Sequence, residues 1–296
     1  FTAMILLIGI AWLLSHILVR PFDRVTLAIR EINDGFNTEQ ISVSDYVETE
    51  HIVNAFNELL GRMRTLDESR QEFVSNVSHE LKTPITSMKV LADSLISQEN
   101  VPIELYKEFM TDIAEEIERE NKIITDLLSL VKMDKTSANL NIENRNLNEL
   151  IELILKRLRP IAKQRNIDVL YESAREVFAE IDEVKLTLAI SNLVENAIKY
   201  NNEYGYVKVS LDADHQFATI MVEDNGIGIP QEAQEHIFER FYRVDKSHSR
   251  EIGGTGLGLA IARNAILLHR GSIKIDSEEG QGTVFTVKIP IIYVSK

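Results

Sequence analysis

Hydrophobic residues recur every three or four positions along two long stretches of the first half of the chain, the spacing of helices with one apolar face. The first stretch runs from about Thr49 to Ser97, and its apolar steps alternate between four and three residues, as in a coiled-coil seam. The second carries its apolar face from Tyr106 to Val131. Two helices joined by a turn at 98–102 cannot cover their own apolar stripes, so we expect a homodimer built around a four-helix bundle.

The pattern changes after a polar break at 133–139, which we interpret as a hinge into a second domain. Short apolar strands then alternate with helices, which favours an α/β sandwich with helices covering one face of a sheet. The expected helices are 147–159, 184–200 and 257–269, and the expected strands are 167–171, 177–181, 207–211, 218–223, 272–276 and 283–289.

Residues 1–19 are almost wholly apolar and carry no formal charge. As a helix they would span about 28 Å, close to the thickness of a bilayer core. Three arginines follow between residues 20 and 30, so we predict a transmembrane helix with the remaining chain in the cytoplasm. A signal peptide would have a basic start and a small-residue cleavage site, and both are missing. A buried soluble helix stays open, because Trp12 lies near the middle of the stretch. The chain begins at Phe1, so we expect a fragment whose upstream part is missing.

Composition narrows the classes of function. The chain has 296 residues, enough for several domains, and a formal net charge of −14, which argues against nucleic acid as a partner. It contains no cysteine, so disulfides, thiolate catalysis and zinc–thiolate sites are excluded.

One histidine in the first long helix stands out through its neighbours. His79 is two residues from both Val77 and Leu81, which turns it away from the seam and toward solvent. Glu80 is adjacent, Thr83 lies one turn below on the same face, and Pro84 predicts a bend because it has no N–H to donate to the carbonyl of Glu80. An ordinary surface histidine fits the spacing equally well. A neutral imidazole beside a carboxylate is nevertheless a candidate nucleophile.

Four segments of the second domain indicate a nucleotide site. Asn192, Asn196 and Lys199 form a polar stripe on one helix, where amide oxygens suit Mg²⁺ and the lysine suits phosphate, unless the stripe is simply solvated. Asp224 ends a strand and can accept from an exocyclic amine, which distinguishes adenine from guanine. The glycines that follow it, Gly226 and Gly228, let the backbone approach a flat ligand.

The third segment is the glycine-rich stretch 253–259, which contains Gly254, Gly256, Leu257 and Gly258 and opens a helix whose first amides can hold phosphate. It is neither a dinucleotide fingerprint nor a P-loop. The fourth is the turn that ends at Thr283, which alone is more typical of a plain hairpin.

The residues Ser78-His79-Glu80-Leu81-Lys82-Thr83-Pro84 resemble the phosphoacceptor box of bacterial sensor histidine kinases. The four segments together resemble the ATP site shared by histidine kinases and the gyrase, chaperone and mismatch-repair ATPases. Residues 20–68 are similar in pattern to a HAMP signal-relay module, although a plain coiled-coil spacer fits them as well. The resemblance implies a transmembrane helix at 1–19, a HAMP-like relay at 20–68, a dimerisation and phosphoacceptor hairpin at 69–136 and a catalytic ATP-binding domain at 137–296.

The resemblance also implies roles for single residues. Asn196 would hold Mg²⁺, Lys199 would meet phosphate, Tyr200 would pack beside adenine and Asp224 would bind its amine. Residues 238–245 resemble the start of a flexible lid, with Arg243 reaching the terminal phosphate and with Phe238 and Phe241 serving in lid packing. The polar segment 231–252 should then be mobile until nucleotide binds.

The implied function is that of a sensor histidine kinase in the bacterial cell membrane. His79 would take phosphate from ATP with Glu80 as base and pass it to an aspartate of a response regulator, and Thr83 would position water to dephosphorylate that regulator. Two other classes stay open. An ATPase clamp without phosphohistidine leaves the box around His79 unexplained, and a non-catalytic coiled-coil scaffold leaves the four nucleotide segments unexplained.

Overall fold

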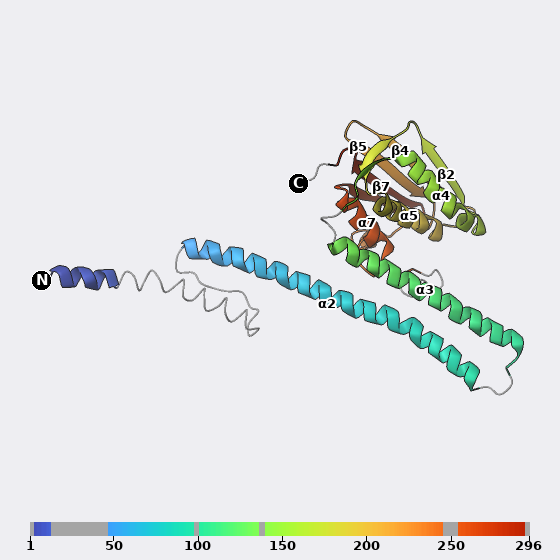
Figure 1. Ribbon diagram of the computed structural model, residues 1–296, viewed down its shortest axis with the longest axis horizontal. Coiled ribbons are helices and arrows are strands. Elements are labelled where there is room, and N and C mark those ends of the chain that lie inside the picture. Colours follow the sequence, from blue (N-terminus) through green and yellow to red (C-terminus); the bar gives the residue numbers. More distant parts are fainter. Residues whose placement is uncertain (1–2, 13–46, 98–100, 136–139, 245–253, 294–296) are drawn as a thin grey trace. The chain divides into compact units, whose positions relative to one another are not determined.

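The computed structural model describes residues 3–12, 47–97, 101–135, 140–244 and 254–293 (Figure 1). The chain divides into two compact units, Phe1–His79 and Glu80–Lys296. The predicted transmembrane segment 1–19 is described only over residues 3–12, which are helical. Across the described ranges, the helices are too short or too polar to cross a membrane. Most of the predicted relay segment, up to residue 46, lies outside the described residues.

The two long helices predicted from the apolar spacing are present. Helix α2 is Val47–Ile96 and continues through Pro84, so the bend predicted there stays a prediction. Helix α3 is Ile103–Lys135. The polar break predicted from Met133 is wrong at its start, because residues 133–135 are helical and the Met133 side chain is only 6% exposed. Burial of the Met133 side chain in the core favours the helical conformation at a position where composition alone indicated a linker.

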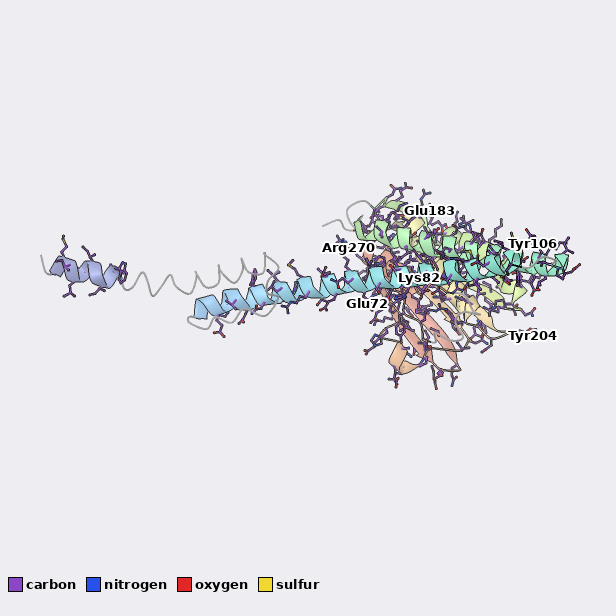
Figure 2. The ribbon with its side chains drawn as sticks, turned by 90° about the horizontal axis from the view of Figure 1, so that it is seen from below. Glu72, Lys82, Tyr106, Glu183, Tyr204 and Arg270 are labelled. Atoms are coloured by element: carbon purple, nitrogen blue, oxygen red, sulfur yellow. The ribbon has the colours of Figure 1, made fainter. Side chains whose placement is uncertain are left out.

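Both helices leave large apolar side chains exposed. On α3, Met110, Ile117, Ile124 and Val131 recur every seven residues and are each at least 40% exposed. On α2, the seam residues Leu59, Met63 and Leu66 are exposed as well. Figure 2 draws the side chains of both helices and labels Glu72 and Lys82 on α2 and Tyr106 on α3.

The second unit is built on a five-stranded sheet in the order β2-β4-β5-β7-β6. The strands are β2 (Asp168–Ser173), β4 (Tyr206–Ala213), β5 (Phe217–Asp224), β6 (Ser272–Glu278) and β7 (Gly282–Pro290). Strands β2 and β4 are parallel, and all other neighbours are antiparallel. Each predicted strand is present, with its ends shifted by a few residues.

A separate two-stranded sheet pairs β1 (Glu143–Asn146) with β3 (Phe178–Ile181). Strand β1 was not predicted, because its four residues Glu-Asn-Arg-Asn are polar and show no alternation. It is a strand through its backbone pairing with β3 and not through burial of side chains.

Helices α4 (Leu147–Gln164), α5 (Glu183–Lys199) and α7 (Gly258–Leu268) cover one face of the sheet, as predicted (Figure 1). The side chain of Asn146 caps α4 by accepting the N–H groups of Asn148 and Glu149. The predicted end of α4 at residue 159 is wrong, because the helix continues past Pro160. The carbonyl that Pro160 leaves without a helical donor belongs to the exposed Lys156, where water can satisfy it.

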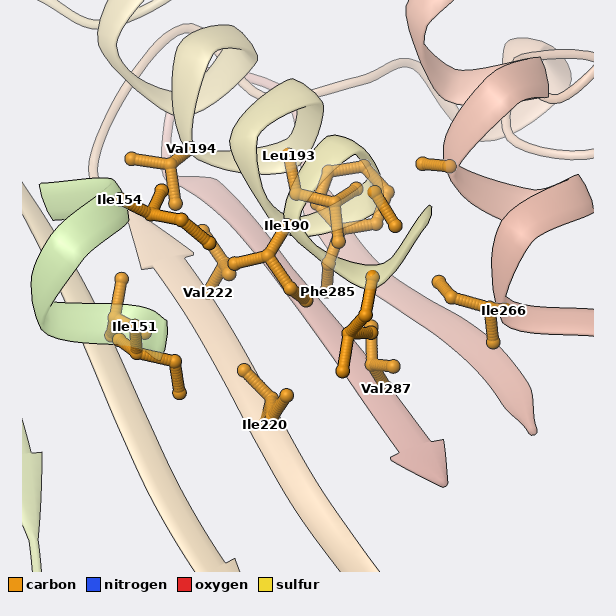
Figure 3. Close-up of a cluster of buried hydrophobic side chains, with 14 of the residues drawn as sticks. Ile151, Ile154, Ile190, Leu193, Val194, Ile220, Val222, Ile266, Phe285 and Val287 are labelled. Carbon is orange, nitrogen blue, oxygen red and sulfur yellow. The ribbon is translucent and has the colours of Figure 1, made fainter. Parts of the chain in front are cut away.

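The core lies between these helices and the sheet. Figure 3 shows Ile151 and Ile154 of α4, Ile190 and Leu193 of α5, Ile266 of α7 and the strand residues Ile220, Val222, Phe285 and Val287 gathered around one interior. Full burial of each such side chain contributes roughly 1.5–3 kcal/mol. Because this apolar face fixes α5 against the sheet, the polar stripe of α5 is held toward the cavity described next.

Candidate functional site

A cavity of about 490 Å³ lies beside α5, the end of β5 and the start of α7. It brings together segments that are distant in the sequence. All the predicted nucleotide-binding residues line it except Gly226 and Leu257: Asn192, Asn196, Lys199, Tyr200, Asp224, Gly228, Arg243, Gly254, Gly256, Gly258 and Thr283.

Asp224 is a buried carboxylate at the end of β5 that lines this cavity, and it is 9% exposed. One of its oxygens accepts the N–H of Gly226 at 2.9 Å. Burial raises the pKa of Asp224 to about 6. Although Gly226 is not on the cavity wall, it shapes the site, because a Cβ at this position would lie 2.3 Å from the carbonyl oxygen of Tyr200. A buried carboxylate with remaining acceptor capacity suits a ligand that carries an amine.

The polar stripe of α5 faces the same cavity. Asn192 donates to the carbonyl of Leu188 at 2.9 Å, which leaves its amide oxygen as an acceptor. Burial, together with the nearby charges of Arg243 and Lys122, lowers the pKa of Lys199 to about 8. The ammonium of Lys199 lies 5.1 Å from the centre of the Tyr200 ring. This concentration of positive charge is suited to phosphate.

The glycine-rich loop passes close to these groups. A Cβ on Gly254 would lie 2.5 Å from Nζ of Lys199. Gly256 has a φ of +67°, which favours glycine, and a Cβ there would lie 2.9 Å from Cα of Phe241. Leu257 is fully buried and precedes the first turn of α7, so it anchors the loop and does not line the cavity.

An apolar wall completes the cavity, and sequence reasoning did not assign it. Ile227, Ile229, Ile237 and Phe285 line it, and their surfaces suit a flat ring. Phe238 packs edge-on against Phe285 with ring centres 6.4 Å apart, as the prediction of lid packing requires.

The lid segment is described only in part. Ala233, in the short 3-10 helix η1 (Gln231–Ala233), and Ile237 are both buried. Residues 245–253 lie outside the described residues, and the mobility of 231–252 stays a prediction.

Lys122 and Asp126 of α3 also line the cavity, and neither was predicted. Lys122 forms an ion pair with Glu195 at 2.8 Å, and Asp126 accepts from the hydroxyl of Thr255 at 3.0 Å. A weak signal was present in the sequence, because Asp126 occupies an apolar spacing between Ile123 and Leu130, both of which are buried.

On α2, the His79 side chain is exposed, as its spacing predicted. Thr83 is exposed and Glu80 is partly exposed. Pro84, the residue after Thr83, is buried. The hydroxyl of Ser78 donates to the carbonyl of Val74 at 2.8 Å, so it is engaged by its own helix.

The residues that are present fit ATP and Mg²⁺. The buried carboxylate of Asp224 lines the same cavity as Lys199, Arg243 and the start of α7, so one molecule that carries an amine and a phosphate chain suits this set of groups. Within the described part of the chain, histidine and acidic side chains do not gather in threes as a protein-only metal site would require. The amide oxygen of Asn196 is a ligand type that suits Mg²⁺, and it would hold the ion together with phosphate oxygens.

Two family models match the chain. Residues 181–292 match the model described as "Histidine kinase-, DNA gyrase B-, and HSP90-like ATPase", and residues 69–136 match the "His Kinase A (phospho-acceptor) domain". Fold and cavity thus define an ATP-binding domain of the first kind, preceded along the chain by a phosphoacceptor hairpin. The chain belongs to the histidine kinases of two-component systems.

The proteins that this chain is similar to are described as sensor kinases or histidine kinases. The sensor histidine kinase WalK of Bacillus subtilis is 38% identical over 76% of this chain and 37% of its own length. A sensor protein kinase WalK of Staphylococcus aureus is 36% identical over 88% of this chain and 66% of its own length. The solved structure of histidine kinase ThkA in complex with response regulator protein TrrA matches with a TM-score of 0.63 at 27% identity, over 77% of this chain and 64% of that one. The chain spans less than half the length of the first curated relatives it matches.

Proposed function

We propose that this chain transfers the γ-phosphoryl group of ATP to His79. An imidazole nitrogen forms a bond to the γ-phosphorus, the bond to the bridging oxygen breaks, and ADP leaves with the electron pair. Glu80 takes or orients the proton on the other ring nitrogen and so acts as general base. The observation that carries the proposal is an exposed histidine in a phosphoacceptor helix together with a cavity that fits ATP in the same chain.

The roles proposed at the cavity follow from its charges. Asp224 accepts from the adenine amine, and Tyr200 packs beside the ring. Lys199 and Arg243 offset the charge that spreads over the phosphate oxygens in a loose transition state. A Mg²⁺ ion at Asn196 would supply further charge neutralisation.

The phosphoryl group then passes from His79 to an aspartate of a response regulator. The similarity to a histidine kinase solved with a response regulator supports this partner. Thr83 lies one turn from His79 and would orient a water molecule for a second activity, the dephosphorylation of that regulator.

We further propose that the protein forms a homodimer in the bacterial cell membrane. The exposed apolar stripes of α2 and α3 support dimerisation. Residues 1–19 would form the membrane anchor, residues 20–68 a HAMP-like relay, and the chain from about residue 20 onward would lie in the cytoplasm. The uncharged sequence of 1–19 and the arginines that follow it support this topology.

Labelling with γ-³²P-ATP tests the acceptor. The wild-type chain should acquire label that is lost in acid and kept in alkali, and His79→Gln should acquire none while binding nucleotide as tightly as the wild type. His51→Gln, which changes an exposed histidine elsewhere on α2, is the matched control and should label normally. Label retained by His79→Gln would refute the acceptor assignment.

A further inference from the structure

The end of α3 contributes a buried acid to the wall of the nucleotide cavity. Asp126 is 8% exposed and lies on the same face of α3 as Ile123 and Leu130, both buried. A carboxylate in such an apolar seam loses its hydration and needs a hydrogen-bond partner to offset the loss. The position of that partner indicates what Asp126 does.

The partner is the hydroxyl of Thr255 in the glycine-rich loop. The Oγ1 hydroxyl of Thr255 donates to Oδ2 of Asp126 at 3.0 Å. Oγ1 of Thr255 also accepts the N–H of Leu257 at 3.2 Å. A hydroxyl has one proton and two lone pairs, so both bonds form together. Asp126 is thereby connected through one side chain to Leu257, the residue immediately before α7.

Thr255 lies between the two glycines that pass closest to the site. A Cβ on Gly254 would approach Nζ of Lys199, and one on Gly256 would approach the backbone of Phe241. Gly256 also accepts the N–H of Phe241 through its carbonyl at 3.0 Å. The loop around Thr255 therefore passes directly beside Lys199 and Phe241, and a shift of Thr255 would change how the loop faces the cavity.

The neighbouring ion pair contributes less. Lys122 and Glu195 are 2.8 Å apart, but their side chains are 58% and 39% exposed. Water and salt screen such a pair strongly, whereas the bond between Asp126 and Thr255 is largely shielded. The buried hydrogen bond between Asp126 and Thr255 therefore contributes more than the ion pair to the position of the loop.

We propose that Asp126 is a positioning residue of the nucleotide site, which holds the glycine-rich loop and the start of α7 in their phosphate-binding arrangement through the hydroxyl of Thr255. This role rests on the proposed function, since it concerns the same ATP site. It makes the phosphoacceptor hairpin part of that site, so that the affinity for ATP depends on the contact between α3 and the loop.

The test is the dissociation constant of a fluorescent non-hydrolysable ATP analogue with Mg²⁺, measured on the full chain. Asp126→Ala and Thr255→Val should each raise the constant roughly tenfold. The double variant should bind no more weakly than either single one, because both changes break the same connection. Thr255→Ser keeps the hydroxyl and should bind within about twofold of the wild type. Asp112→Ala, at an exposed acid on α3, is the matched control and should change nothing.

Asp126→Asn covers the case in which Asp126→Ala fails to fold, since its amide oxygen can still accept from Thr255 and it should retain most of the affinity. Unchanged affinity in Asp126→Ala and Thr255→Val, or losses that add in the double variant, would overturn the role of Asp126 and leave the proposed function intact. A wild-type chain that does not bind the analogue would overturn the proposed function itself.

Discussion

The ring of His269 joins the end of α7 to the start of α5. Nε2 accepts the backbone N–H of Asp182 at 2.9 Å, and Nδ1 donates to the carbonyl of Ala265 at 2.7 Å. Both partners are backbone groups with fixed roles, so the ring must be neutral with its proton on Nδ1. Asp182 is the N-cap of α5, and the two helices that border the nucleotide cavity are therefore held together at this point.

This arrangement predicts a loss of stability in acid. Burial lowers the pKa of His269 in the folded chain, whereas the unfolded ring binds a proton near pH 6.5. As the pH falls through that value the unfolded state binds more protons, so the free energy of unfolding should decrease. Urea unfolding at pH 5.5 and 7.5 measures the effect. His269→Phe should lower stability by roughly 2–3 kcal/mol at pH 7.5 and weaken the pH dependence. His215→Gln is an exposed control, and an equal slope in His269→Phe would refute the prediction.

Asp224 predicts a pH dependence of nucleotide binding. Since its pKa is about 6, the empty site holds a largely protonated carboxyl below that pH. An amine donor prefers the ionised form, so affinity for ATP should fall as the pH drops from 7 to 5, and binding should release protons in that range. Calorimetric titration in buffers of different ionisation enthalpy measures both.

Replacement of the same residue separates binding from stability. Asp224→Asn should abolish detectable ATP binding and yet raise the free energy of unfolding of the nucleotide-free protein by on the order of 1–2 kcal/mol, because it removes a buried charge. Asp276→Asn, at an exposed acid on β6, should change neither quantity. A destabilised Asp224→Asn that still binds ATP would contradict both expectations.

Lys199 predicts proton uptake on binding. Its pKa of about 8 reflects burial and neighbouring positive charge, and phosphate would raise that pKa toward its usual value. At pH 8 the chain should therefore take up about half a proton per ATP bound. Titration calorimetry at pH 8 in two buffers gives this number, and Lys199→Met should lose the uptake together with affinity. An uptake that is unchanged in Lys199→Met would assign the proton to another group.

The apolar stripe of α3 predicts self-association. Ile124 is 43% exposed at the centre of the row that contains Ile117 and Val131. A lysine there would lie in the proposed dimer interface, so Ile124→Lys should sediment as a monomer at concentrations at which the wild type is a dimer. Glu118→Lys, at an exposed polar position of the same helix, should leave the dimer intact. A monomeric wild type would refute the four-helix bundle.

Thr83 is predicted to separate the two activities of the hairpin. Thr83→Ala should keep autophosphorylation and reduce dephosphorylation of the regulator roughly tenfold or more, because the water it orients would lose its position. The release of phosphate from a phosphorylated regulator measures this. Thr86→Ala, at another exposed threonine of the same helix, is the matched control. An unchanged phosphatase rate in Thr83→Ala would remove the role.

Local patterns predicted most of the fold and much of the cavity. The spacing of Asn192, Asn196 and Lys199 placed three wall residues correctly, because a helix converts sequence spacing directly into a face. Strand β1 escaped prediction because pairing alone, without apolar alternation, makes it a strand. The predicted end of the helix before Pro160 came too early. A proline inside a helix destabilises it less where the carbonyl that loses its N–H donor is exposed to water than where that carbonyl is buried.

The contributions of α3 were out of reach for a different reason. Asp126 and Thr255 are separated by 129 positions, and their contact exists only in three dimensions. An acidic residue in an apolar row marks a position that has a partner, but it does not say where the partner is. The apolar wall of Ile227, Ile229, Ile237 and Phe285 has the same origin, since apolar residues of separate segments line one cavity only through the fold.

The parallel pairing of β2 with β4 has a consequence for how this domain tolerates change. Two parallel neighbours require the chain to travel back across the sheet between them, and here the return path is β3 followed by α5. The helix that carries the paired asparagines is thus an obligatory crossover of the sheet. Extra residues inserted at the β4–β5 turn around Asp214 would leave that crossover whole, whereas a break near 174–176 would sever it. A break in this connection would therefore disrupt the sheet and displace the cavity residues of α5 at the same time.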